Sequence, residues 1–150
     1  MASVPFIIRG VYTGLVDLEG IARLEPGALV LEFQTVHALS DFFKSRSREI
    51  RIPLQDIEAV SFQRRLLTGV LKIRAGRLEA FRDMPGATGS EIKVRCRREH
   101  FAEAEELASR ISMRAVTEDL REMIAANDRS RSPRGEPPNT GRSGAAHPTG

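Results

Sequence analysis

The stretch REIRIPLQDIEAVSFQRRLL (48–67) decides the fold, because it holds two alternating segments and the corner that joins them. Ile50, Ile52 and Leu54 share one phase of a period of two, which is typical of a strand with one buried face. Pro53 falls in the outward phase near the end of its segment, where a missing N–H removes little from a sheet. The stretch therefore predicts two strands, 48–54 and 57–65.

Hydrophobic alternation predicts five further strands outside this stretch. They are a long, bent strand over 10–25, its partner over 28–34, and strands over 70–75, 78–81 and 91–97. Gly14 and Gly20 lie in phase within the first of these, where glycine permits the bulge or bend of a curved sheet. Residues 37–47 break the alternation and fit either a loop or a short helical excursion. Seven short strands separated by turn signals indicate an antiparallel sandwich or barrel.

The period becomes helical after Glu99, and it produces two apolar stripes. The first stripe consists of Phe101, Ala104, Ala108, Ile111 and Ala115, and the second of Val116, Leu120, Met123 and Ile124. At ~100° per residue the second stripe is rotated by roughly 140° from the first, so one straight helix cannot bury both against one surface. Thr117 is a possible N-cap, and we therefore expect a kink or break near Val116, with the second stripe facing something other than the sheet.

The composition is that of one soluble domain, with 150 residues, 41% of them hydrophobic and 29% charged. We expect this domain over 1–126 and a disordered tail over 127–150, which has no large apolar residue. Cys96 is the only cysteine, which excludes an intramolecular disulfide and a cysteine-based zinc site. Since no eighteen apolar residues run together and no basic segment precedes the first apolar run, we expect a cytoplasmic protein.

Four segments together suggest a family. They are LVLEFQ (29–34), REIRIPLQDIEAV (48–60), MPG (84–86) and EIKVRCRREHFAEAEELA (91–108). This pattern resembles the pleckstrin-homology-like (PH-like) superfold, and within it the small bacterial PH-like proteins, over about residues 11–112. The resemblance implies a mainly β fold with a C-terminal α-helix: a seven-stranded antiparallel PH-like barrel or sandwich, capped by an amphipathic helix.

The resemblance also implies a non-catalytic domain that binds lipid headgroups or proteins. The chain departs from the lipid-binding members at 24–28, where LEPGA replaces their basic loop, and it has no tryptophan for the terminal helix. Both departures put the usual phosphoinositide pocket in doubt.

Basic residues gather in the second half of the expected sheet. Residues 48–98 carry twelve Lys and Arg against six Asp and Glu, whereas 99–126 carry three against seven. The candidate ligand-binding face comprises Arg64, Arg65, Lys72, Arg74, Lys93, Arg95 and Arg97. Such a face suits phosphate or an acidic partner, although charged residues are ordinary on the solvent side of a strand, and Glu79 and Glu91 could relieve their repulsion.

We expect a binding or assembly module for a protein partner or a second copy of the chain, with the second stripe and the basic face as contacts. Peripheral binding to an anionic membrane through the basic face is the alternative. Nucleic-acid binding is less favoured, because the best helix is acidic and no aromatics interleave with the basic strands. We expect no enzyme, no cofactor and no metal, since His37, His100 and His147 stand apart and no catalytic motif is present.

Overall fold

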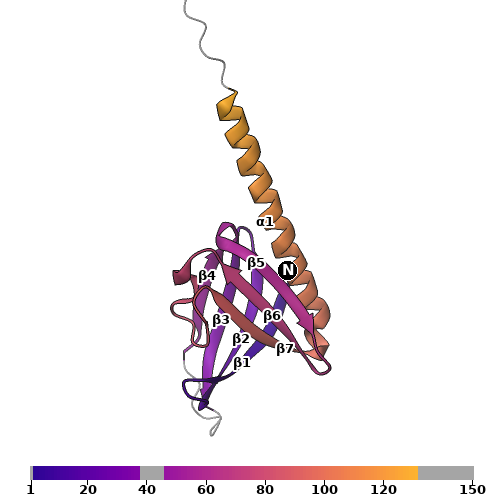
Figure 1. Ribbon diagram of the computed structural model, residues 1–150. Coiled ribbons are helices and arrows are strands. Elements are labelled where there is room, and N and C mark those ends of the chain that lie inside the picture. Colours follow the sequence, from indigo (N-terminus) through magenta and orange to yellow (C-terminus); the bar gives the residue numbers. More distant parts are fainter. Residues whose placement is uncertain (1, 38–45, 132–150) are drawn as a thin grey trace, which may run out of the picture.

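The computed structural model describes residues 2–37 and 46–131, and within them the chain forms seven strands and one long α-helix (Figure 1). The strands are β1 (Ser3–Val11), β2 (Val16–Glu25), β3 (Ala28–His37), β4 (Arg48–Pro53), β5 (Ile57–Arg64), β6 (Thr68–Ala75) and β7 (Glu91–Arg97). The long helix is α1 (Phe101–Ser130), and three short 3-10 helices are η1 (Leu54–Asp56), η2 (Leu78–Phe81) and η3 (Arg98–His100).

All seven strands belong to one antiparallel sheet in the order β4-β3-β2-β1-β7-β6-β5. The sheet is not closed into a barrel, because β4 and β5 form its two edges. It bends at the junction of β1 and β7, which pair only between Ile7 and Arg95, whereas β1 pairs with β2 along most of its length. The expected mainly β fold of seven antiparallel strands with a C-terminal helix is therefore confirmed, as an open and bent sheet.

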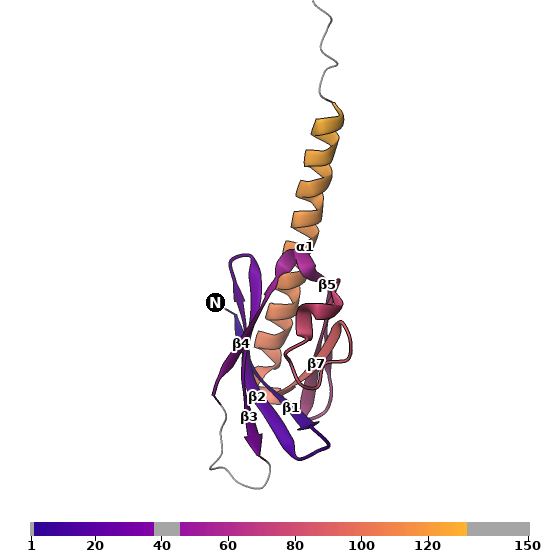
Figure 2. The same cartoon turned by 90° about the vertical axis from the view of Figure 1, so that its left-hand side faces the viewer.

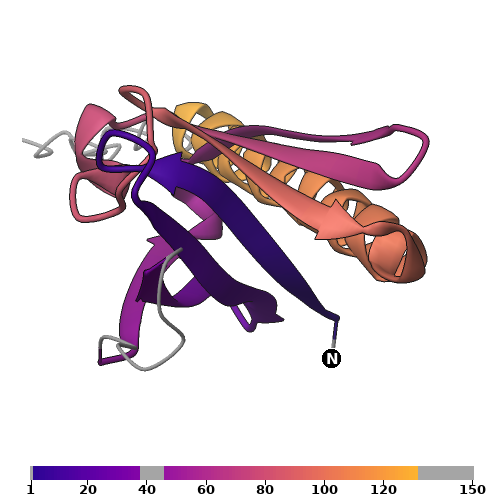
Figure 3. The same cartoon turned by 90° about the horizontal axis from the view of Figure 1, so that it is seen from below.

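The first half of α1 fills the opening that the bent sheet leaves. Figures 2 and 3 show β1–β4 and β5–β7 as two halves, with α1 lying across the space between them. Ala104, Leu107 and Ile111 are almost fully buried there, against side chains from both halves such as Leu18 and Ile73. Burial of this apolar surface is the main stabilising contribution to the fold.

The corner at 54–56 agrees with the sequence. Leu54 is buried at the start of η1, and its N–H donates to the carbonyl of Gly27 at 3.0 Å. Ile57 then begins β5 with its side chain in the core. The single turn of η1 therefore carries the chain from one edge strand of the sheet to the other.

Two of the strand predictions were wrong. Residues 10–25 are not one bent strand, because Tyr12, Thr13 and Gly14 adopt positive φ and form the turn that joins β1 to β2. The alternation of Val4, Phe6 and Ile8, which marks β1, was missed. Residues 78–81 form η2 in place of the expected strand.

The predicted break in the helix near Val116 was also wrong. The α-helix continues from Phe101 to Ser130, and Thr117 does not cap a new helix. Its hydroxyl donates to the carbonyl of Met113 one turn back, at 2.8 Å, which satisfies the side chain without interrupting the helix. The first residues of the expected tail are helical, since α1 includes Asn127–Ser130. Residues 132–150, and most of the segment 37–47, lie outside the described residues.

Replacement of Gly20 by alanine is expected to destabilise the fold by about 2–3 kcal/mol, because the site is already filled. A Cβ there would lie 2.4 Å from the carbonyl oxygen of Glu32 and 2.6 Å from Cζ of Phe6. Gly76→Ala is the matched control, since its Cβ would meet nothing closer than 3.8 Å. Urea unfolding measures both, and equal midpoints for the two variants would contradict this account of the packing.

Candidate functional site

The second half of α1 projects beyond the sheet. Ile111 is the last buried residue of the helix, Ala115 is half-buried, and all other residues from 112 to 131 are exposed. Figure 1 shows this part of the ribbon leaving the body of the protein. At 1.5 Å per residue, residues 112–130 extend for about 28 Å. We call residues 112–130 the α1 extension.

An apolar stripe lies along the α1 extension. The stripe comprises Met113, Val116, Leu120, Met123 and Ile124, whose exposed fractions lie between 53% and 68%. Relative to the buried residues Ala104, Leu107, Ala108 and Ile111, it is rotated by roughly 150° about the helix axis at ~100° per residue. Most of the stripe therefore faces away from the sheet, as the sequence predicted, while Val116 also borders a hollow beside η1 and β5. The prediction omitted Met113. The helical period alone would have found Met113, which lies three residues before Val116.

The basic face of β6 and β7 is partly neutralised by two glutamates. Lys72 and Lys93 are direct neighbours across the two strands, and Glu91 lies between them with N–O distances of 3.1 and 3.6 Å. Arg74 pairs with Glu58 of β5 at 3.1 Å. The hydrogen bond from Lys72 is the main cause of the lowered pKa of Glu91. Three of the seven predicted ligand-binding residues are thus already paired within the protein.

Arg64 also has a partner, on α1. Its Nε and one terminal nitrogen donate to the two carboxylate oxygens of Glu105, and its guanidinium lies 5.8 Å from the centre of the Phe101 ring. The hydrogen bond raises the pKa of Arg64 and lowers that of Glu105. The planar guanidinium matches a carboxylate bidentately, so this pair fixes the end of β5 against the start of α1. Arg64 is therefore better explained as a structural residue than as a ligand-binding one.

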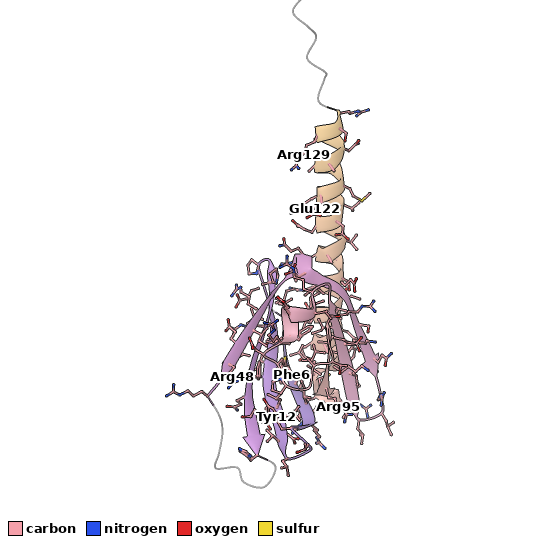
Figure 4. All side chains as sticks on the ribbon, turned by 60° about the vertical axis from the view of Figure 1, so that its left-hand side comes forward. Phe6, Tyr12, Arg48, Arg95, Glu122 and Arg129 are labelled. Carbon is pink, nitrogen blue, oxygen red and sulfur yellow. The ribbon has the colours of Figure 1, made fainter. Side chains whose placement is uncertain are left out.

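Arg65, Arg95 and Arg97 make no ion pair with any residue that the structure describes. Arg95 and Arg97 line a groove of about 470 Å³. The groove lies beside Ile7 and Arg95, the residue pair through which β1 and β7 join in the sheet. Its walls include Pro5, Phe6, Ile7, Gly20, Ile21, Phe33 and Gln34, with Glu19, Glu32, Glu99 and His100 at polar positions. In Figure 4, Phe6 is labelled near the middle of the sheet and Arg95 to its right, while Arg48 points outward at the left, from the edge strand β4. Sequence patterns do not predict this groove, because the separation of β1 from β7 depends on the bend of the sheet.

Neither the cysteine nor the histidine near the groove is arranged for catalysis. Cys96 is buried, and desolvation raises the pKa of its thiol, which disfavours the reactive thiolate. His100 lies 3.5 Å from Glu99 on the surface. Among residues 2–37 and 46–131, no three metal-ligating side chains come together. The absence of an enzymatic activity stays a prediction.

Comparison of the chain with protein-family models, with curated proteins and with solved structures gives no match. The resemblance to PH-like proteins therefore also stays a prediction. No helix in the described part of the chain has the length and apolar character needed to cross a membrane.

The Arg64–Glu105 pair predicts a specific pH dependence. Because the folded pKa of Glu105 is lowered, its stabilising contribution is present above the ordinary pKa of a glutamate and is lost as the pH falls through the lowered folded value. Glu105→Gln should therefore lower the unfolding midpoint at neutral pH. It should have no effect in acid, where the Glu105 carboxyl is protonated in both the folded and the unfolded protein. Glu106→Gln, on the same turn but paired only with Arg110, is the control. A difference between wild type and Glu105→Gln that is independent of pH would contradict the assignment.

Proposed function

We propose that the protein is a non-catalytic binding and assembly module of the PH-like type, and that the stripe on the α1 extension is its main protein-binding surface. The observation that carries this proposal is the exposure of five large apolar side chains on one face of a helix that leaves the sheet. Single exposed apolar residues are ordinary on protein surfaces, but a contiguous apolar surface marks an interaction site.

The length of the α1 extension supports the same proposal. Most helical stability in proteins comes from packing of an apolar face against other elements and less from intrinsic helix propensity. The first half of α1 obtains this stability from the sheet, through Leu107 and Ile111. The extension has no comparable contact with the described residues, so packing of the stripe against a partner would supply the missing stability.

The groove beside β1 and β7 offers a second contact, for a single carboxylate of a partner at Arg95 and Arg97, whereas Glu19, Glu32 and Glu99 in its walls disfavour a strongly acidic segment. Arg95 and Arg97 present guanidinium groups that no described residue pairs with, beside the exposed apolar side chain of Ile21. A carboxylate-bearing peptide with an apolar side chain fits this combination. Binding to an anionic membrane is less favoured, because the pairs of Lys72, Arg74 and Lys93 with glutamates lower the positive charge of the broader face.

Leu120→Asp should abolish association with the helix partner, because it places a charge in the middle of the stripe. Removing one buried leucine and burying a carboxylate together correspond to at least a hundredfold loss of affinity. Ala125→Asp introduces the same charge on the exposed far side of the helix and should leave association unchanged. Light scattering on the purified chain and on its copurified complexes measures both, and equal behaviour of the two variants would contradict the proposed role of the stripe.

Arg95→Glu should weaken binding of a carboxylate-bearing peptide by about tenfold or more, because it removes one charge-assisted contact and adds repulsion in the groove. Arg48→Glu changes the net charge equally at an exposed position outside the groove and should have a much smaller effect. Titration with a fluorescent peptide that carries one glutamate beside apolar residues, at physiological salt, measures the difference. Equal losses in the two variants would show that only net charge matters.

A further inference from the structure

We propose that the partner of the α1 extension is a second copy of the same chain, whose α1 packs parallel and in register along residues 113–127. This inference rests on the proposed function and specifies its partner.

The apolar residues of the extension follow the spacing of a two-helix seam. Steps of three and four residues alternate through Met113, Val116, Leu120, Met123 and Asn127. This is the a/d spacing of a coiled coil, with Met113, Leu120 and Asn127 at the a positions and Val116 and Met123 at the d positions. Ile124 borders the seam at an e position. Helices that bind a groove on another protein also use anchors at three- and four-residue steps, so the choice of a second copy rests on Asn127 and on the charges that flank the seam.

The geometry of the protein leaves room for this pairing. The stripe lies roughly 150° around the helix from the residues that α1 buries against the sheet, at ~100° per residue. Two parallel helices joined along their stripes would therefore carry their sheets on opposite outer sides. The seam cannot extend far toward the start of the helix, because the preceding positions on the same face are Glu106 and Ser109. The interface is thus confined to the α1 extension.

Charges at the flanking positions favour parallel over antiparallel pairing. An antiparallel register that pairs Met113 with Met123 of the second copy brings Asp119 opposite Asp119 of the second copy. The next antiparallel register opposes Arg110 to Arg131 of the second copy. In the parallel arrangement Asp119 lies beside Ile124 of the second copy, and no like charges face each other.

Asn127 reinforces the parallel register. In that register it faces Asn127 of the second copy, where two amides can hydrogen-bond across the seam. In the first antiparallel register it would face Ser109 of the second copy, and in the other it would oppose the apolar Val116 of the second copy. A single asparagine at an a position specifies register and orientation at a cost in stability.

Disulfide cross-linking under oxidising conditions tests the arrangement in the full chain. Met123→Cys should form a covalent dimer, because residue 123 faces its own counterpart only in the parallel register. Ala125→Cys, on the far side of the helix, should remain monomeric on a non-reducing gel. The wild-type chain should also remain monomeric, since Cys96 is buried. Cross-linking of Ala125→Cys to the same extent as Met123→Cys would overturn the inference.

A mixed experiment separates the two orientations. Met113→Cys and Met123→Cys chains of different tag lengths are oxidised together. Parallel pairing predicts covalent dimers of equal tags, with 113 linked to 113 and 123 linked to 123, and no enrichment of dimers with unequal tags. Enrichment of 113–123 links, identified by peptide mass, would establish antiparallel pairing and overturn the proposal.

Substitution of Asn127 gives an independent readout. Asn127→Leu should tighten self-association by about tenfold or more in sedimentation equilibrium, and should let 113–123 links appear beside the parallel ones. Unchanged affinity and unchanged links would show that Asn127 lies outside the seam.

The failure of this inference is distinguishable from failure of the proposed function. A wild-type chain that stays monomeric up to millimolar concentration overturns self-association. If Leu120→Asp then releases a copurified protein that Ala125→Asp retains, the stripe binds a different protein and the proposed function stands. If neither variant changes any association, both proposals fail.

Discussion

The open sheet makes the first half of α1 indispensable to this structure. Because β4 and β5 do not pair with each other, the two halves of the sheet leave an apolar opening, and Leu107 and Ile111 fill it. The Arg64–Glu105 pair and the edge-to-face contact of Phe62 with Phe101 hold the end of β5 against the start of the helix. Once the first three turns are fixed in this way, the direction of the remaining turns is determined. The α1 extension therefore presents its stripe to solvent at a fixed angle to the sheet.

The strands and the helix were predictable where one face of an element is buried along its whole length. The corner from Ile52 through Leu54 to Ile57 follows directly from the alternation, as do β6 and β7. The first hairpin was not predictable in the same way, since Tyr12 and Thr13 adopt the positive φ that sequence patterns assign to glycine. Tyr12 lies in the same phase of a period of two as Val16 and Leu18, so the alternation continues through the turn and indicates one strand.

The surfaces were less predictable than the core, for a physical reason. The sequence shows which residues are basic, but not which carboxylates come within reach of them, and Glu58, Glu91 and Glu105 neutralise part of the predicted face. The stripe was predictable because it depends only on the helical period. The stripe lies on one continuous face only because the helix continues through Thr117. The sequence had suggested a break at this residue.

We propose that the α1 extension is a protein-binding helix, stabilised by packing of its stripe against a second copy. Amide hydrogen exchange of peptides covering 113–127, measured over a range of protein concentrations, tests it most directly. The account predicts rapid exchange in dilute solution and increasing protection at higher concentration, while peptides of β6 and β7 keep constant protection throughout. If exchange in 113–127 does not depend on protein concentration, the proposal is contradicted. This holds whether exchange is rapid throughout or slow throughout, including at concentrations where the chain is monomeric.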